Sequence, residues 1–196
     1  MTMVINHDSL HLPTVDLVES RVQQFNQTLV VSENALSKLF RQYPRNTALD
    51  EVLIKVATLN DIYRTSIWAT YYVAEHIVEL NIDPLIAAGM PEIVNPIALI
   101  RIGNKPRNNY SFATKYCAWH NPTAYPIYDG YVGQILLAYS KKDQFDSFYQ
   151  YELWDYPRFK RIVENFRSFY NLTPFGFKDL DKFLWLEGKD LFNQLA

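Results

Sequence analysis

The sequence predicts an all-α protein, built as a compact bundle of about eight to ten helices. Three observations favour this class: 48% of the 196 residues are hydrophobic, apolar residues recur at intervals of three and four, and only six glycines and ten prolines interrupt the chain. The segment "FYQYELW" at 148–154 is the one strand candidate, and it is short. The length suits a single domain over residues 1–196, or two lobes, 1–90 and 91–196, that share a core.

The first half of the chain carries three predicted helical segments. Residues 16–30 have an apolar stripe at helical spacing, formed by Leu17, Val18, Val22, Phe25 and Leu29. Ser32 is suited to cap a second helix, which should end at Tyr43 because a residue before proline disfavours helical geometry. Asn46 or Thr47 opens a third, long helical segment, "ALDEVLIKVATLNDIYRTSIWATYYVAEHIVEL".

The second half is predicted to contain shorter helices separated by turns. Asp83 and Pro84 are typical of a cap followed by a first helical residue, and Gly89 and Gly103 are typical helix ends. The expected helices run from Pro84 to Gly89, Pro91 to Ile102, about Tyr110 to His120, Tyr128 to Tyr139, Tyr156 to Tyr170 and Lys178 to Asn193. The loop "GNKPRNN" precedes the third of these helices, and the turn "NPTAYP" follows it.

Charge and composition restrict the class of function. The net charge of −2 argues against a protein that coats nucleic acid nonspecifically, although Arg101, Lys105, Arg107 and Lys115 form a basic cluster with no acidic residue among them. No long apolar run and no basic start before an apolar stretch occur, so we expect neither a membrane span nor a secretory signal. A lone Cys117 fits a reducing cytoplasm, and four scattered histidines predict no metal or cofactor site.

Asn60 stands on an apolar stripe of the long helical segment. The stripe consists of Leu53, Val56, Asn60, Tyr63 and Ile67, and Arg64 lies one turn beyond Asn60. An amide within a core must find hydrogen-bond partners, so one interpretation is a structural amide that ties helix ends or loops together. The other is that Asn60, Tyr63 and Arg64 line a cleft between lobes, where they would bind a base or a phosphate.

Lys115 and Asp129 form the second unusual pair. Within helix 110–120, Phe112, Tyr116 and Trp119 define the core face and Lys115 lies at its edge, where a lysine ordinarily extends to solvent. Asp129 precedes an apolar-periodic helix and is therefore predicted to be its N-cap. An ionised carboxylate at a helix N-terminus is also able to stabilise positive charge on a bound sugar, so the capping and catalytic roles are compatible.

The strings "ATKY" and "NPTAYPIYDGYV" resemble the helix-hairpin-helix DNA glycosylase superfamily, in particular its 8-oxoguanine glycosylases. In that family a lysine on the helix after a hairpin is followed by a Pro-x-Asp motif whose aspartate caps the next helix. The resemblance implies that Lys115 is the nucleophile and Asp129 the essential aspartate. The family's hairpin carries Gly-x-Gly, whereas "RIGNKPRNNYS" has only Gly103, and its basic residues would take over the phosphate contact.

A second resemblance covers more of the chain. The strings "LNDIYRTSIW", "YSFATKYCAWHNPTAYPIYDGYV" and "LDKFLWLEGKDLF" look like those of a bacterial family of uncharacterised proteins, which supports one folded unit. Near the C-terminus, Trp185 and Gly188 are expected to pack on the core; an exposed Trp185 would instead suggest a stacking platform.

Two hypotheses from different classes follow. In the first, the chain is a DNA base-excision glycosylase and lyase in which Lys115 attacks the sugar and Asp129 stabilises the developing charge. Tyr63, Trp119 or His120 would then stack on a flipped base, and Arg101, Lys105 and Arg107 would hold the DNA backbone. In the second, it is a non-catalytic helical module of a regulatory or defence system that binds nucleic acid, a protein partner or a second copy of itself.

Overall fold

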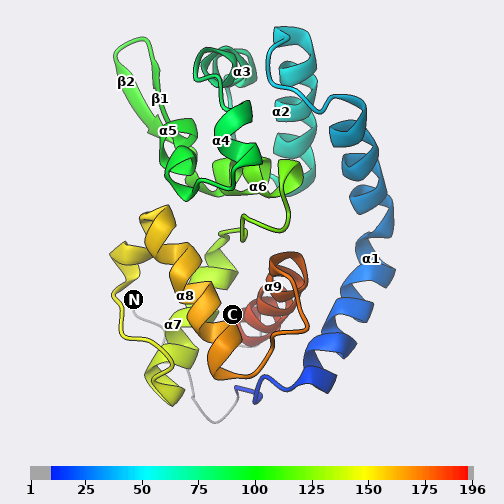
Figure 1. Ribbon diagram of the computed structural model, residues 1–196, viewed down its shortest axis with the longest axis vertical. Coiled ribbons are helices and arrows are strands. Elements are labelled where there is room, and N and C mark those ends of the chain that lie inside the picture. Colours follow the sequence, from blue (N-terminus) through cyan, green and yellow to red (C-terminus); the bar gives the residue numbers. More distant parts are fainter. Residues whose placement is uncertain (1–9, 194–196) are drawn as a thin grey trace. The chain divides into compact units, whose positions relative to one another are not determined.

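The computed structural model describes residues 10–193 and confirms the all-α class (Figure 1). Within these residues, nine α-helices accompany two short 3₁₀ helices and one two-stranded sheet. The elements in chain order are α1 (Val15–Gln42), α2 (Leu49–Tyr63), α3 (Thr70–Glu79), α4 (Asp83–Ala87), η2 (Pro91–Ile93), α5 (Val94–Ala98), β1 (Leu99–Ile102), β2 (Lys105–Asn108), α6 (Tyr110–His120), α7 (Gly130–Asp143), η3 (Gln150–Trp154), α8 (Tyr156–Phe169) and α9 (Phe177–Asn193).

The chain divides into two compact units. The middle unit comprises Leu29–Ile127, and the terminal unit comprises the residues up to Thr28 together with those from Tyr128 onward. Helix α1 contributes to both. The sequence predicts two helices here, separated near Ser32, and the structure instead has one helix of 28 residues with non-helical dihedrals at Leu29 (φ −115°, ψ 15°). The predicted interruption is therefore present as a kink, which coincides with the unit boundary.

In the middle unit, the long segment that begins near residue 47 forms two helices rather than one. Helix α2 ends at Tyr63 and α3 begins at Thr70. Between them, Arg64 and Ser66 adopt left-handed dihedrals (φ 50° and 59°), which reverse the chain and allow α3 to pack against α2. The buried face of α2 is Val52, Lys55, Val56 and Leu59, one position away from the stripe expected through Leu53 and Asn60.

A β-hairpin stands where the sequence suggested the end of a helix and a loop. Helix α5 ends at Ala98, and β1 pairs antiparallel with β2 so that Ile100 faces Arg107 and Ile102 faces Lys105. Gly103 has φ +59° at the first of the two turn positions, a conformation that glycine adopts at little cost. The predicted strand candidate at 148–154 is wrong, because residues 150–154 form the 3₁₀ helix η3.

In the terminal unit, an ion pair with a buried carboxylate connects the first half of α1 to α9. The Glu187 carboxylate is almost fully buried and accepts a hydrogen bond from Arg21 Nε at 2.6 Å, while His11 Nδ1 lies 2.8 Å from its other oxygen. Helices α7 and α9 also pack closely, since a Cβ added at Gly188 would lie 2.8 Å from the Tyr131 carbonyl oxygen. Trp185 is half-buried against Phe25 and Tyr131, as expected for packing on a core.

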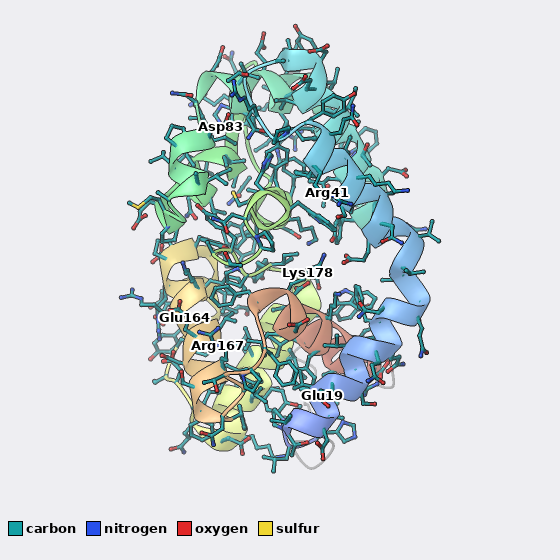
Figure 2. All side chains as sticks on the ribbon, turned by 45° about the vertical axis from the view of Figure 1, so that its right-hand side comes forward. Glu19, Arg41, Asp83, Glu164, Arg167 and Lys178 are labelled. Atoms are coloured by element: carbon teal, nitrogen blue, oxygen red, sulfur yellow. The ribbon has the colours of Figure 1, made fainter. Side chains whose placement is uncertain are left out.

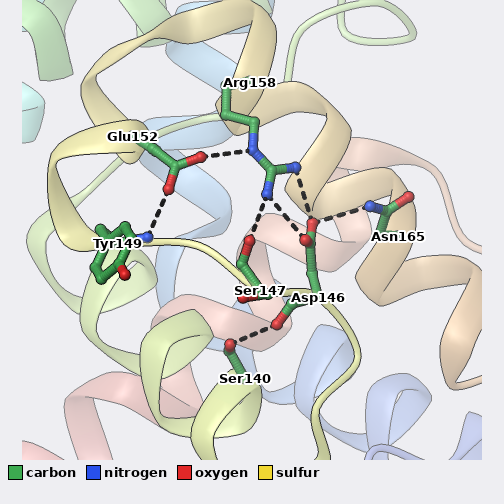
Figure 3. Close-up of polar contacts among 7 residues, drawn as sticks. All are labelled: Ser140, Asp146, Ser147, Tyr149, Glu152, Arg158 and Asn165. Atoms are coloured by element: carbon green, nitrogen blue, oxygen red, sulfur yellow. Dashed lines mark hydrogen bonds and ion pairs between the residues drawn. The ribbon is translucent and has the colours of Figure 1, made fainter.

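A second charged cluster fixes the segment between α7 and α8 (Figure 3). The Arg158 guanidinium donates to both Asp146 oxygens (3.0 and 2.9 Å) and to Glu152 Oε1 (3.1 Å), and Asn165 donates to Asp146. Although burial opposes the effect, these hydrogen bonds lower the pKa of Asp146. Glu152 also accepts from the Tyr149 amide, which lowers the pKa of Glu152 and closes the capping box of η3.

Candidate functional site

Lys115 lies in the middle of α6, a helix buried on almost every side. The residues from Phe112 to Ala118 are all buried, and Lys115 itself is only 3% exposed. Its Nζ donates a hydrogen bond to Ser111 Oγ at 2.6 Å, one turn earlier on the same helix. The expectation that a lysine at this position extends to solvent is therefore wrong: packing around α6 removes the amine from water.

Tyr63 and Trp119 share this environment. Lys115 Nζ lies 5.3 Å from the centroid of the Tyr63 ring, a cation–π distance. Trp119 Nε1 donates to the Tyr63 hydroxyl at 3.0 Å, which fixes the phenol between the lysine and the indole. Three of the residues singled out from the sequence, Lys115, Tyr63 and Trp119, thus come together within the middle unit, from α2 and α6.

Asn60 performs the structural task that its sequence position suggested. Its side chain is half-buried; Nδ2 donates to the Ile67 carbonyl (3.1 Å), and Oδ1 accepts from the Ile67 amide (2.8 Å) and the Thr65 hydroxyl (2.9 Å). The amide group therefore ties down the loop between α2 and α3. Arg64 is the exposed, left-handed C-cap of α2 and belongs to the same loop.

His120 belongs to a different cluster, centred on Lys55. The Lys55 amine is fully buried and donates to the carbonyls of Tyr43 (3.0 Å) and Arg45 (2.7 Å) and to Asn46 Oδ1 (2.8 Å). His120 Nε2 lies 3.4 Å from this amine. Burial, together with the nearby Lys55 charge, lowers the pKa of His120 to about 3, so its imidazole is neutral near pH 7.

Asn46 and Asp83 complete the Lys55 cluster. The Asp83 carboxylate accepts from the Asn46 amide nitrogen (3.0 Å) and from its Nδ2 (2.6 Å), and Tyr116 donates its hydroxyl proton to Asn46 Oδ1 (2.5 Å). Asp83, labelled in Figure 2, thus binds a connection elsewhere in the middle unit rather than capping α4, whose N-cap is Ile82. Asn46 likewise is not the N-cap of α2, a position held by Ala48.

Sequence reasoning missed Lys55, although a signal for it exists. Val52, Lys55, Val56 and Leu59 repeat at helical spacing, which marks Lys55 as one member of an apolar stripe. Burial lowers the pKa of Lys55 to about 8, while Asp83 and Glu51 act in the opposite direction.

Cys117, on the neighbouring helix α6, is fully buried, and burial raises the pKa of its thiol, so it is unsuited to act as a thiolate nucleophile.

Asp129 belongs to the terminal unit, where it is the N-cap of α7, as predicted. Its Oδ1 accepts a hydrogen bond from the Tyr131 amide at 2.8 Å. The helix begins at Gly130 and ends at Asp143, so it starts two residues later and continues further than the expected range of Tyr128–Tyr139. Since Lys115 and Asp129 lie in different units, their pairing in one site stays a prediction.

The basic residues of the hairpin are all exposed. Arg101 lies on β1, and Lys105 and Arg107 lie on β2, a strand whose four residues are all exposed. Opposite residues of an antiparallel pair project to the same side, so Arg107 and Lys105 share a side with Ile100 and Ile102, and Arg101 projects to the other. The hairpin therefore presents cations on both of its faces.

Two further properties bear on the kind of site. Within residues 10–193, no three His, Cys, Asp or Glu side chains lie together in a way that could hold a metal ion. None of the helices in this described part of the chain combines the length and the apolar character needed to cross a membrane.

Comparison with known proteins identifies the family. Residues 16–124 match the family model HI_0787_N, described as an N-terminal domain, and this range contains Asn60, Tyr63, Lys115 and the hairpin but not Asp129. An uncharacterized protein from Haemophilus influenzae (strain ATCC 51907 / DSM 11121 / KW20 / Rd) is 40% identical over 148 residues, which cover 75% of this chain and 71% of that protein. No solved structure matches the chain. The chain therefore belongs to the HI_0787_N family.

Proposed function

We propose that the chain is a DNA base-excision glycosylase with lyase activity, in which Lys115 is the nucleophile. The observation that carries the proposal is the environment of Lys115: the residue is 3% exposed, and its amine lies next to Ser111 Oγ and over the Tyr63 ring. Nucleophilic attack requires this amine in its neutral form, and the hydrogen bond to Ser111 Oγ holds the amine at a defined position beside the Tyr63 ring.

In the proposed reaction, a target nucleotide leaves the base stack and presents its sugar to Lys115. The amine nitrogen forms a bond to C1′ while the glycosidic bond from C1′ to the base nitrogen breaks. The electron pair of that bond leaves with the base, which takes up the proton that the amine gives up. The bond from C1′ to the ring oxygen then breaks, the oxygen takes up a proton from solvent, and a protonated Schiff base forms between Lys115 Nζ and C1′. Loss of a proton from C2′ expels the 3′ phosphate and cuts the strand, and water then hydrolyses the Schiff base and releases Lys115.

Asp129 and the hairpin have supporting roles in this proposal. The Asp129 carboxylate, oriented by its bond to the Tyr131 amide, would stabilise the oxocarbenium-like charge at C1′. Arg101, Lys105 and Arg107 would contact phosphates, because the hairpin places all three in solvent immediately before the helix that carries Lys115. The Tyr63 ring contacts the amine and Trp119 donates to the Tyr63 hydroxyl, and these two aromatic residues would support the displaced base or sugar.

Borohydride trapping tests this proposal directly, since it reduces a Schiff base to a stable amine. The protein of residues 1–196 is incubated with duplexes that carry one abasic site, or one 8-oxoguanine, in the presence of borohydride. We expect a covalent protein–DNA adduct that is absent in Lys115→Gln, while the Lys115→Gln protein still binds the duplex through its other cations. Lys141→Gln, which alters an exposed lysine of α7, is the matched control and should be trapped normally.

Two results would refute parts of the proposal. An adduct that forms equally in Lys115→Gln would assign the nucleophile to another residue. A parent protein that binds no DNA at low salt would exclude the nucleic-acid function itself.

A non-catalytic binding module is the second candidate, favoured by a different observation. Tyr149 and Tyr151 in the terminal unit are both exposed, and their rings are stacked, with centroids 5.6 Å apart and planes at 9°. The Arg158 cluster holds this segment in place, and tyrosine is enriched at protein interfaces. For this candidate we expect no trapped adduct, and self-association or partner binding that Tyr149→Ala and Tyr151→Ala together abolish.

A further inference from the structure

Trp68 is the most exposed large hydrophobic side chain in the described part of the protein. It is 98% exposed, and it lies in the loop between α2 and α3, directly after the buried Ile67. Tyr71 and Tyr72, in the first turn of α3, are each about half exposed, and their rings meet edge to face with centroids 5.8 Å apart. Together, Trp68, Tyr71 and Tyr72 form what we term the aromatic platform.

The loop that carries Trp68 is attached to α2 by hydrogen bonds of the Asn60 side chain. Asn60 binds the amide and the carbonyl of Ile67, and it also binds the Thr65 hydroxyl. Arg64 and Ser66 adopt left-handed dihedrals, which fix the path of the chain between these contacts. An aromatic side chain on a fixed loop loses less conformational entropy when a ligand binds than one on a flexible loop, so the indole is presented in a form suited to binding.

The hairpin that carries the exposed cations contacts α3, a helix that itself has no lysine or arginine and carries Glu75 and Glu79. Strand β1 contacts α3, and His76 Nε2 lies 2.9 Å from the Pro96 carbonyl oxygen, just before the hairpin. The hairpin's three cations, Arg101, Lys105 and Arg107, are exposed, and no acidic residue occurs in the sequence between Glu92 and Asp129.

We infer that the middle unit binds single-stranded nucleic acid, with unpaired bases stacked on the aromatic platform and phosphates held by the hairpin cations. The chemistry on the two sides is complementary: an exposed indole offers a π-face that stacks on any base, and the hairpin offers positive charge for the backbone. A duplex keeps its bases stacked inside and would contact the hairpin but not the platform. The inference shares its class of ligand with the proposed function but requires neither Lys115 nor Asp129.

The test uses undamaged single strands, so that no base-excision chemistry takes part. Binding of a labelled twelve-nucleotide oligo(dT) to the protein of residues 1–196 is measured at low salt by fluorescence anisotropy. We expect Trp68→Ala to weaken binding about tenfold or more and Trp68→Phe to keep most of it. Phe169→Ala removes another exposed aromatic ring (49%), on α8 in the terminal unit, and should change the affinity less than about twofold.

An abasic strand of the same length separates stacking from phosphate contact. It keeps every phosphate and lacks the bases, so the parent protein should bind it about as weakly as Trp68→Ala binds oligo(dT). Oligo(dT) should also quench the long-wavelength tryptophan emission of the parent protein, and Trp68→Phe should remove this response.

Two results would overturn the inference. One is an unchanged oligo(dT) affinity in Trp68→Ala, with the fold verified by circular dichroism. The other is a Trp68→Ala variant that converts a dimer into a monomer in light scattering while oligo(dT) binding stays the same; the platform would then be covered by a second copy of the chain. If borohydride traps no adduct while oligo(dT) binding depends on Trp68, the enzymatic proposal alone is refuted.

Discussion

The Asn60 side chain binds the amide and the carbonyl of Ile67 at the same time, at 2.8 and 3.1 Å. The Asn60 side chain thereby supplies the backbone hydrogen bonds of Ile67 that a β-turn or a further helical turn would otherwise provide. This relationship accounts for the exit of the chain from the helix after Tyr63 without a glycine or a proline, and it fixes the backbone of the buried Ile67 directly before the exposed Trp68.

Replacement of Asn60 should therefore act on the loop. We expect Asn60→Leu to lower the free energy of unfolding by about 1–3 kcal/mol, because the partners of the amide are left without it. Urea denaturation monitored by circular dichroism measures this change. Asn104→Ala, at the exposed tip of the hairpin, is the control and should change stability by less than about 0.5 kcal/mol. Equal stability of Asn60→Leu and the parent would contradict the structural role.

The buried Lys55 amine predicts a particular pH dependence of stability. The pKa of Lys55 is about 8 in the folded protein, below its ordinary value of 10.5, so between these values the unfolded chain binds more protons than the folded one. The contribution of Lys55 to stability is therefore least favourable below pH 8 and becomes more favourable as the pH rises. The free energy of unfolding of the parent should rise by up to about 2 kcal/mol between pH 7.5 and 9.5, relative to that of Lys55→Met. Urea denaturation of both proteins at each pH measures this difference.

Comparison with Lys55→Met is needed because other groups oppose this trend. Burial raises the pKa values of Cys117, Tyr116 and Tyr125, so the folded state loses stability as the unfolded chain releases their protons at high pH. These contributions are present in the parent and in Lys55→Met and largely cancel in the difference. A stability difference that is flat across this range would show that the folded lysine titrates normally.

Gly188 offers a test of the packing between α7 and α9. A Cβ at this position would lie 2.8 Å from the Tyr131 carbonyl oxygen, which is backbone and cannot rotate away. Gly188→Ala should therefore cost about 1–3 kcal/mol through overpacking, despite the better helix propensity of alanine. Gly130→Ala is the matched control, because nothing lies within 4 Å of a Cβ there, and it should be neutral or stabilising. Similar thermal midpoints for both variants would contradict the close approach.

The sequence predicted correctly, or to within one residue, those helix ends that are determined by neighbouring residues. Helix α6 has the expected bounds, α8 and α9 differ from expectation by one residue at one end each, and Asp129 caps α7. Each of these features is encoded by apolar periodicity and by a cap or a turn next to it in the sequence.

The remaining features depend on residues distant in the sequence. Lys55 is buried because two carbonyls and Asn46 surround its amine, and nothing at position 55 itself reports them. The apolar run "IVNPIALIRI" is compatible with helix or strand, and pairing with residues 105–108 decides the outcome. Of the candidate site, the contacts among Lys115, Tyr63 and Trp119 arise from the packing of α2 on α6, which the sequence does not specify.

The last prediction separates the two roles of Asp129, which caps α7 and is the proposed partner of Lys115. Asp129→Ala removes the acceptor for the Tyr131 amide and should cost about 1 kcal/mol of stability. Asp129→Asn keeps an acceptor oxygen of similar size and, since asparagine caps helices about as well as aspartate, should retain most of that stability.

Activity should not follow stability in these variants. A neutral amide cannot stabilise positive charge on the sugar, so Asp129→Asn should slow base release from a lesion-containing duplex by orders of magnitude while its thermal midpoint stays close to the parent's. Single-turnover kinetics together with thermal melts measures the two quantities on the same preparations. An Asp129→Asn protein that releases the base at the parent rate would leave Asp129 as a cap alone.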